Sequence, residues 1–551
     1  MSFKTNEYSQ MTLDDRTLSL TKRESKMLQA SWAENFRKVV FPKINEEPFR
    51  ILYSDNDNSR PNTPVNVKIG SLILKEMFGQ SDGELVGSVV FDTRYQHALN
   101  TTSFQEQPLS VRSLARFRAG IFRHYMETGE DLLETEMKRI AKDFAHFMSI
   151  EPTLKRMDSL MISTNARIMG RLELIYTCTE MLVRLVKRLG GEEYLTPGLA
   201  AYLDEGSHNA VCYHGKDEES QTRMEKALED AALAFSLCGE EYTEFDEYRN
   251  MERMLKEQAK ITDGRHVLKE NSELRARNMQ TPHDPEATYR KKAGKKYVGY
   301  VGNVVEDVGE NGAIITEFDL QPNVYTDTDF AKDTIERMGY QEKRVILSVD
   351  GAFASDETIL LAEQNNIELI PTGLVGSATD EIILDFDIDE ETGKVNSCPA
   401  GKEPIAQKYD EEKEEYVCHF DKKSCQECPH RERCRAAIQK KAAKVIISDK
   451  KRRRAELQQK LSSGSLAEYA AFRNGVEGIP SVLRRRYDVD NMSVFGLLRL
   501  KMCFSLKIGA INVKRVLAYA SYRSLFQKIS QFLMQTHRNC HFENSFVHFR
   551  I

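Results

Sequence analysis

The feature that most constrains the fold of this chain is a pair of aspartates placed in short apolar runs. Asp158 lies within residues 154–163, and Asp350 directly follows residues 345–349; both runs are built around Leu, Met, Ile or Val. Runs of this length are typical of buried β-strands. A carboxylate is costly in such surroundings unless it binds something. We therefore predict two strands whose acidic side chains hold a ligand.

A third acidic residue, Glu477, lies in a stretch flanked by Arg473 and Arg484, which suits a partner with negative charge. Two aspartates on strands and one glutamate on a helix can hold two divalent cations roughly 3.5–4 Å apart, the arrangement that activates water and stabilises the leaving oxygen in phosphodiester cleavage. Mg²⁺ and Mn²⁺ prefer oxygen ligands. We therefore predict that Asp158, Asp350 and Glu477 are catalytic and bind Mg²⁺ or Mn²⁺.

The surroundings of the two aspartates resemble those in bacterial insertion-sequence DDE transposases, which have an RNase H-like catalytic domain. Asp158 stands in Met-Asp-Ser-Leu-Met-Ile-Ser, which is similar to the first-aspartate strand of that family. Asp350 is followed by Gly-Ala-Phe-Ala-Ser, which is similar to the family's Asp-x-Gly-Tyr-x-Ser theme, except that the glycine directly follows the aspartate. The likeness covers about residues 60 to 520.

The region of Glu477 carries the same resemblance. Arg473, Glu477 and Arg484 have a spacing similar to the Tyr-Arg-Glu-Lys signature of these enzymes, with an arginine in the lysine position and Tyr469 one residue further upstream than the signature expects. Arginine suits phosphate through its fork of donors, so we predict that Arg473 and Arg484 contact DNA. The alternative is that both are ordinary surface arginines. Pro480 predicts a local break in this helix, because proline removes a helix hydrogen bond.

The resemblance implies a DNA transposase that cleaves at transposon ends and transfers the freed strands into target DNA, with a divalent metal ion. It implies double-stranded DNA as the partner, both as transposon ends and as target. Because two ends are joined in concert, we expect a symmetric homodimer on DNA. Two alternatives stay open: an RNase H-like nuclease without strand transfer, and a domesticated, non-catalytic DNA-binding protein, against which the intact acids argue.

The predicted fold class is α/β, an RNase H-like mixed sheet with helices, preceded by an all-helical domain. Between residues 297 and 371 the pattern predicts strand, strand, helix, strand, helix and strand, the order that an RNase H-like domain requires. The predicted domains are a helical DNA-binding region (1–150), the first part of the catalytic core with a helical insertion at about 165–262 (151–373), an acidic, Cys-containing insertion with a basic helix from Ala436 to about Lys460 (374–465), and the helix of Glu477 with the C-terminal helices (466–551).

An Arg-rich segment of the N-terminal region, residues 109–125, is predicted to bind DNA. Arg112 and Arg116 accompany apolar residues, and a short helix at 82–89 precedes them, an order similar to a helix-turn-helix whose second helix could enter a major groove. The alternative is an amphipathic helix with solvated arginines. This part of the chain also resembles the helical domain that opens the transposases named above.

Cysteines crowd one part of the insertion. Cys425 and Cys428 form a CxxC pair, and closely spaced thiolates with a downstream cysteine predict a tetrahedral Zn²⁺ site. Cys398, Cys418 and Cys434 are nearby, so five thiols are available for four positions. We predict that Cys418, Cys425, Cys428 and Cys434 are the four ligands; the alternative is a loose cysteine cluster without metal. A metal ion would help an insertion with little apolar content to fold.

The composition, with 40% hydrophobic and 29% charged residues, is that of an ordinary folded protein. No stretch approaches the roughly 18 apolar residues of a membrane span, and the N-terminus has no apolar signal core, so we expect a protein of the bacterial cytoplasm, associated with the nucleoid. The net charge of −6 does not by itself suggest nucleic acid. DNA contacts local patches rather than the average, however, and basic residues crowd 290–296, 440–454 and 484–486.

Overall fold

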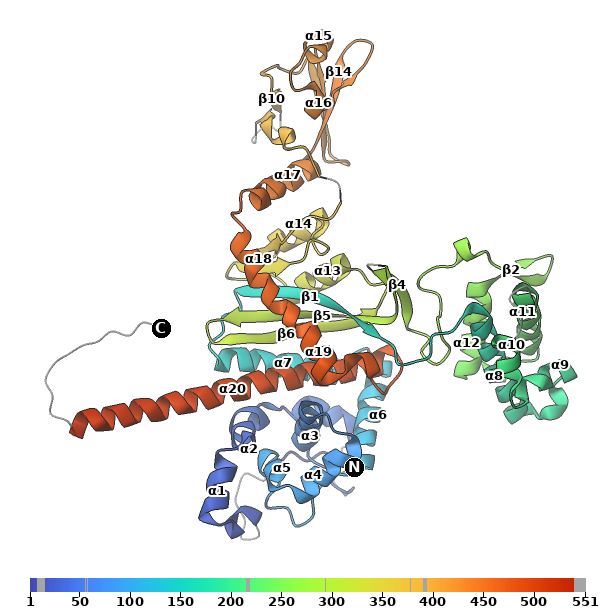
Figure 1. The fold of residues 1–551 in the computed structure, drawn as a ribbon, viewed down its shortest axis with the longest axis vertical. Helices are drawn as coiled ribbons and strands as arrows, with labels where there is room; N and C mark the ends of the chain where they lie inside the picture. The colour runs from blue at the N-terminus through green and yellow to red at the C-terminus, as the bar shows by residue number, and fades with distance from the viewer. Residues whose placement is uncertain are drawn as a thin grey trace.

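Figure 1 shows a central sheet with helices on both sides, a helical body to one side of it and a small β-rich body at the far end of the molecule. The computed structural model describes residues 1–6, 15–54, 56, 58–214, 219–292, 294–376, 378–389 and 394–539, with side chains up to residue 525. Among the helices in these ranges, none has both the length and the apolar character that a membrane span requires.

The central sheet has the strand order β4-β5-β1-β7-β8. β4 pairs with the first part of β5, and β6 pairs with the remainder of the same strand. β1 runs antiparallel to β5 and parallel to β7, and β7 runs parallel to β8. The elements are β1 (Leu154–Ser163), β4 (Thr288–Lys292), β5 (Lys295–Gly309), β6 (Gly312–Pro322), α13 (Asp327–Met338), β7 (Val345–Val349), α14 (Asp356–Gln364) and β8 (Ile367–Pro371). From β5 onward this confirms the predicted element order, and the mixed sheet is compatible with an RNase H-like fold; β4 was not predicted.

The two faces of the sheet belong to different cores because successive side chains of a strand point to opposite sides. Leu160 and Ile162 of β1 face a core that the sheet shares with the N-terminal helices and the C-terminal helix. Met157 and Met161 face a second core, which α13 and α14 close. Asp158 has the parity of Leu160, so it lies on the first face.

The N-terminal region is helical, as predicted, and packs against the C-terminal helix α20 (Leu497–Asn539) below the sheet (Figure 1). Among its helices, α3 is almost completely buried, and α7 and α20 lie against β6. Its α-helices are α1 (Lys22–Gln29), α2 (Trp32–Asn35), α3 (Val65–Phe78), α4 (Asp82–Phe91), α5 (Thr93–Ala98), α6 (Val111–Thr128) and α7 (Leu132–Phe147).

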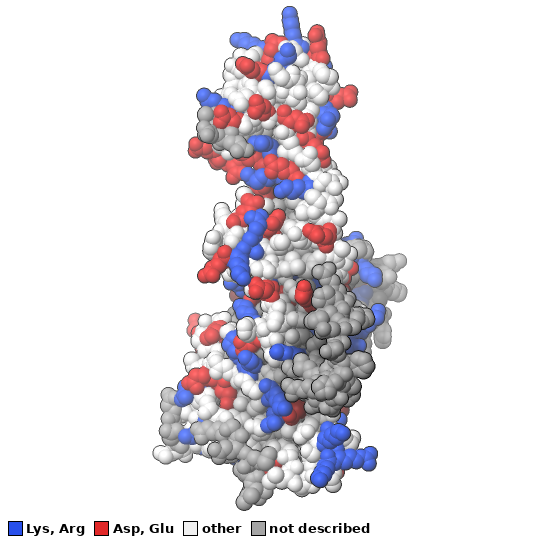
Figure 2. Space-filling view, turned by 90° about the vertical axis from the view of Figure 1, so that its left-hand side faces the viewer, with Lys and Arg blue, Asp and Glu red and all other residues white. Residues whose placement is uncertain are grey.

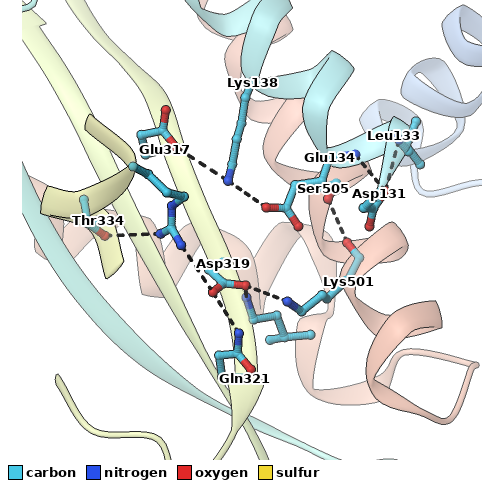
Figure 3. Close-up of polar contacts among 12 residues, drawn as sticks. Asp131, Leu133, Glu134, Lys138, Glu317, Asp319, Gln321, Thr334, Lys501 and Ser505 are labelled. Atoms are coloured by element: carbon cyan, nitrogen blue, oxygen red, sulfur yellow. Dashed lines mark hydrogen bonds and ion pairs between the residues drawn. The ribbon is translucent and has the colours of Figure 1, made fainter. Parts of the chain in front are cut away.

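Ion pairs fasten β6 to the helices around it (Figure 3). Lys138 of α7 lies 3.5 Å from Glu317, and Lys501 of α20 donates to Asp319 over 2.9 Å. Arg337 of α13 lies 3.9 Å from the same Asp319. Although burial raises the pKa of Asp319, the neighbouring cations and hydrogen bonds leave it below its ordinary value. β6 pairs with one strand only, so this charged network and the two helices cover a sheet edge that would otherwise be open to pairing.

The helical insertion between β1 and β4 has a hydrophobic core of its own. Helices α8 to α12 lie within the segment 165–262 that the sequence predicts to be helical, and they are followed by a hairpin that ends at Leu268. Its elements are α8 (Arg171–Gly190), α9 (Pro197–Ala200), α10 (Ser207–Cys212), α11 (Ser220–Ser236), α12 (Asp246–Gln258), β2 (Ala259–Thr262) and β3 (Arg265–Leu268).

The Cys-containing insertion forms a small sheet of order β11-β12-β14-β13, beside a short β9-β10 pair. The predicted basic helix from Ala436 to about Lys460 is wrong in its first part, because the apolar β-branched run Val445-Ile-Ile pairs with β12; the helix begins at Asp449. The elements are β9 (Asp387–Ile388), β10 (Val395–Ser397), β11 (Ala406–Asp410), β12 (Glu415–Phe420), α15 (Lys422–Gln426), α16 (Arg431–Cys434), β13 (Ala437–Ile438), β14 (Ala443–Ser448) and α17 (Asp449–Ser462).

The chain then returns to the sheet through α18 (Ala467–Asn474), a 3₁₀ turn (Gly475–Glu477) and α19 (Gly478–Tyr487), and it ends in α20. The register of α20 on the sheet is set by Asn512, whose side-chain amide donates to Ile315 O over 2.7 Å and accepts from Ile315 N over 2.9 Å. Asn512 is buried, so both backbone groups of Ile315 depend on this one side chain.

We predict that Asn512→Ala lowers the free energy of unfolding by about 1–3 kcal/mol, because a buried N–H and a buried C=O lose their partner. Urea unfolding followed by the fluorescence of Trp32, the single tryptophan, measures the change. Asn209→Ala, at an exposed position of α10, is the control and should leave the midpoint unchanged. Equal midpoints for both variants would show that Asn512 does not fasten α20.

Candidate active site

Strand pairing brings the two predicted catalytic aspartates next to each other. β1 and β7 are parallel neighbours, and their last paired residues are Arg156 and Ser348. Asp158 and Asp350 each follow two positions later, so both lie just beyond the point where the paired strands separate. Asp158 accepts the N–H of Ser159 over 2.9 Å, and Asp350 accepts the N–H of Gly351 over 2.8 Å. The side chains of two distant segments are thereby oriented at one end of a strand pair.

Helix α18 crosses the same face of the sheet and delivers Glu477. Ser348 of β7 donates to the carbonyl of Tyr469 over 3.1 Å, and Arg156 of β1 donates to the carbonyl of Phe472 over 3.0 Å. The Arg156 guanidinium also lies over the Phe472 ring, 5.5 Å from its centroid. Arg156 and Ser348, which precede Asp158 and Asp350 by two residues, therefore hold α18, the helix directly before the turn that contains Glu477.

Arg473 joins the first and third predicted acids. Its Nη2 lies 3.0 Å from Oδ1 of Asp158, and its Nη1 lies 3.0 Å from Oε1 of Glu477. Arg473 is buried, whereas the Glu477 side chain is 58% exposed. The structure thus brings Asp158, Arg473 and Glu477 into one ion-pair cluster.

Burial raises the pKa of Asp158 above its ordinary value, and the neighbouring Asp350 carboxylate acts in the same direction, against the opposing effect of Arg473 and the Ser159 N–H. This electrostatic coupling is further evidence that the two aspartates share one site. A partly buried carboxylate with a second carboxylate beside it is a candidate ligand for cations.

The three acids have the right chemistry for Mg²⁺ or Mn²⁺, because they offer only oxygen. Across the described ranges, however, no group of three or more His, Cys, Asp or Glu side chains is arranged to hold a metal ion. At the three acids the physical reason is that the Arg473 guanidinium lies between Asp158 and Glu477. The donor set fits a divalent cation, provided that Arg473 moves.

The helix of Glu477 contains the local break that Pro480 predicts. Residues Gly475–Glu477 form a 3₁₀ turn with right-handed helical dihedrals, followed directly by α19. Gly475 is required by packing here, because a Cβ at this position would overlap the Arg156 guanidinium. Gly351, next to Asp350, is similarly close to another segment: a Cβ there would lie 2.6 Å from the carbonyl oxygen of Gly373.

Arg484, predicted to contact DNA, lies on α19 at the other end of β1. It donates to the carbonyl of Met161 over 2.7 Å and lies 3.2 Å from Oδ2 of Asp490. The other oxygen of Asp490 accepts the N–H of Ser163 over 3.1 Å. Arg484 therefore fastens α19 to β1, and contact of its guanidinium with a phosphate stays a prediction.

Arg112 and Arg116 lie on α6 of the N-terminal region, before the strand that carries Asp158. Both side chains are exposed and line a hollow of the N-terminal region together with Arg60. The predicted short helix is α4, and Asp82 at its start pairs with Arg118 of α6. A further helix, α5, lies between the two helices, so the connection is longer than a simple turn.

The cysteines are distributed differently from the predicted ligand set. Cys418 is fully buried on β12, and burial raises its pKa to about 11. Burial and the nearby thiols of Cys398, Cys425 and Cys428 raise the pKa of Cys434 to about 11. The thiols that influence one another are thus those of Cys398, Cys425, Cys428 and Cys434, with Cys398 where the sequence suggested Cys418.

Asp284, a further buried acid close to the sheet, has a structural role. It accepts hydrogen bonds from the Tyr300 hydroxyl over 2.5 Å, the Thr164 hydroxyl over 2.6 Å and the Gly496 N–H over 3.1 Å. These contacts join the end of β1, β5 and the start of α20. The pKa of Tyr300 is raised by burial and by this carboxylate.

Sequence reasoning missed Arg156, Ser348 and Glu306. Glu306 of β5 is fully buried and accepts from Arg156 over 2.7 Å and from Arg515 of α20 over 2.6 Å. The signal for Arg156 was present, since a charged residue two positions before Asp158 shares its face of the strand. The partners of Arg156 lie 150 and 316 positions away, and the sequence gives no local sign of them.

Residues 397–517 match a family model described as "Transposase DDE domain". The match covers less than a quarter of the chain and includes Glu477 and Arg473, while Asp158 and Asp350 lie outside it. No curated protein and no solved structure matches the chain. The family match supports a transposase DDE domain over residues 397–517.

Two glycines on either side of Glu477 give a matched test of the docking by Arg156. Gly475 faces the guanidinium, whereas a Cβ on Gly478 has no described atom within 4 Å; both residues are helical. We predict that Gly478→Ala stabilises the protein by up to about 1 kcal/mol through helix propensity. Gly475→Ala should instead destabilise it, because the guanidinium must leave buried acceptors at a cost of about 1–3 kcal/mol. Urea unfolding followed by circular dichroism compares them; equal gains would contradict the docking.

Proposed function

We propose that this chain is a bacterial insertion-sequence transposase that cuts DNA at transposon ends and joins the freed 3′ ends to target DNA. The observation that carries the proposal is the convergence of Asp158, Asp350 and Glu477 from β1, the end of β7 and the α18–α19 junction. The family match over the Glu477 segment supports it independently. The coarser statement, a protein with a transposase DDE domain, rests on that match alone.

In the proposed site, Asp158, Asp350 and Glu477 hold Mg²⁺ or Mn²⁺, which when bound activates water and stabilises the leaving oxygen of a phosphodiester. The N–H groups of Ser159 and Gly351 keep the aspartates turned toward the site. Glu477 is exposed on one side and can turn toward a cation without leaving the helix. Arginines at the edge of the site, Arg473 among them, take DNA phosphate as their partner.

Charge supports a DNA partner only locally. Figure 2 shows basic and acidic side chains interspersed along one side of the molecule, so the net charge of −6 is spread rather than gathered there. Arg112 and Arg116 have no acidic partner among the described side chains, in contrast to Arg118, which is neutralised by Asp82. We assign the unpaired arginines of α6 to the binding of transposon-end DNA. We further propose that a homodimer joins the two ends.

A nuclease of the same fold that cuts without strand transfer is the second candidate, and the same three acids would serve it. Incubation of the protein with DNA ends, a circular target and Mg²⁺ separates the two. Covalent end–target joints are expected of the transposase, whereas cut ends without joints would indicate the nuclease.

A structural Zn²⁺ ion in the Cys-containing insertion also stays a proposal, now with Cys398 in place of Cys418. Three of the four thiols, those of Cys398, Cys425 and Cys434, pack on the small core of this insertion. Elemental analysis of protein made under zinc-replete, reducing conditions decides it: about one Zn²⁺ per chain, lost in Cys398→Ser and kept in Cys418→Ser, is expected, and no zinc would leave a loose cysteine cluster.

We predict that Asp158→Asn, Asp350→Asn and Glu477→Gln each abolish DNA cleavage and leave DNA binding nearly unchanged. The amide keeps the shape of the side chain but not the charge that retains the metal ions. The loss should exceed the roughly 10–100-fold effect of removing an outer-shell partner of a metal ligand. Glu468→Gln, an exposed acid on α18, is the control and should cut like the wild type. A triad variant that cuts at the wild-type rate would remove that residue from the site.

We predict that Arg112→Ala with Arg116→Ala weakens binding to transposon-end DNA and lowers the slope of log affinity against log salt by about 0.9 for each lost phosphate contact. The loss therefore shrinks as salt rises, and cleavage of saturating DNA survives. Arg94→Ala removes an exposed arginine already neutralised by Asp92, and should change neither quantity. Fluorescence anisotropy at several salt concentrations measures both; an unchanged slope in the double variant would show that α6 does not contact phosphate.

A further inference from the structure

The guanidinium of Arg473 occupies the space between two of the three proposed metal ligands. It makes one 3.0 Å ion pair with Asp158 and another with Glu477, and its side chain is only 10% exposed. The two pairs use different Nη atoms, so they form at the same time. The cation that these carboxylates hold in the structure is therefore a side chain of the same chain.

Arg473 nevertheless lacks one hydrogen bond. Its Nε is buried and has no hydrogen-bond partner among the described residues, and the residue as a whole is more than nine-tenths buried. A guanidinium carries five N–H donors in a fixed fork, and a buried donor without an acceptor costs free energy. The unpaired Nε can donate to a further acceptor, with negative charge or a lone pair, in another state of the site.

The charges around Arg473 explain why it can be held in this position. Asp158 and Asp350 are neighbours at the end of the β1–β7 pair and repel each other, and Glu477 adds a third negative group. One guanidinium offsets part of that charge. A divalent cation on the same carboxylates would offset more of it, and its repulsion would drive the guanidinium away, since like charges a few ångströms apart in a partly buried site repel strongly.

We propose that Arg473 is a built-in competitor for the metal: it neutralises Asp158 and Glu477 in the DNA-free protein and must leave before they can take a divalent cation. The inference rests on the proposed function of the three acids. Once displaced, the guanidinium carries all its donors, Nε included, to an oxygen-rich anion, and DNA phosphate at the cleavage site has that chemistry. Metal binding and phosphate binding are thereby coupled, so the site binds a divalent cation weakly until DNA is bound.

An opposite role for the same contacts is that Arg473 pre-arranges the two carboxylates for the metal. The two roles predict opposite signs. A competitor weakens metal binding, so its removal tightens it, whereas a pre-arranging residue strengthens metal binding, so its removal weakens it.

The test is Mn²⁺ binding to the full-length protein without DNA, with free Mn²⁺ measured by electron paramagnetic resonance. For Arg473→Gln we expect a dissociation constant about tenfold lower than that of the wild type, which corresponds to about 1.4 kcal/mol. Arg485→Gln, on the exposed side of α19, removes the same charge close by and should change the constant much less. Arg473→Lys keeps a positive charge but reaches one carboxylate at a time, so its constant should lie between the two.

Weaker or unchanged Mn²⁺ binding in Arg473→Gln overturns the inference, as does an equal gain in Arg485→Gln. If Arg473→Gln does not fold, as judged by circular dichroism, Arg473→Lys decides, and a constant no lower than that of the wild type overturns it. Failure of the proposed function has a different signature: Asp158→Asn and Asp350→Asn would then bind Mn²⁺ like the wild type, because the metal ion would not lie at these acids.

Discussion

The docking of α18 through the Arg156 guanidinium is the interaction on which the geometry of the site depends. Arg156 extends from β1, donates to the carbonyl of Phe472 and lies over its ring, so the turn of helix before Glu477 is held at a fixed height above the sheet. The guanidinium is in turn held by Glu306, which has no exposed side-chain surface and also accepts from Arg515 of α20. A buried carboxylate is tolerable only with such partners. Arg156 and Glu306 thus form one charged network that joins α20, the sheet and α18.

The order of elements around the sheet could be predicted from the sequence because the relevant signals are local. The apolar runs of β5 to β8 are separated by short helices and by the Gly309-Glu-Asn-Gly312 turn, and each pattern identifies its own element. The prediction failed at β14. Its charged and alanine-rich surroundings favour a helix, and only pairing with β12 along Phe420–Glu415 makes this segment a strand. That pairing is a tertiary contact, and it overrides local preference.

The sequence predicts the residues of the candidate site but not their contacts. Asp158, Asp350 and Glu477 each stand in a recognisable local context, and strand register then brings the two aspartates together. Arg473 was predicted to contact phosphate, and no local pattern shows that it bridges two acids, one of which is 315 positions away. The same holds for the cysteines: Cys418 is buried on β12, and no local pattern shows which side of that strand faces the core.

Asp158, Asp350 and Glu477 are proposed to form one metal site from which Arg473 has to withdraw. The most direct measurement is a crystal structure of the protein with Mn²⁺ and a cleaved transposon-end DNA, with the metal ions located by their anomalous scattering. We expect Mn²⁺ bound by oxygens of Asp158 and Asp350, with Glu477 turned toward it and Arg473 on a phosphate instead of on Asp158. Mn²⁺ elsewhere in the molecule, with the bridge from Arg473 to Asp158 and Glu477 intact beside the DNA, would contradict it.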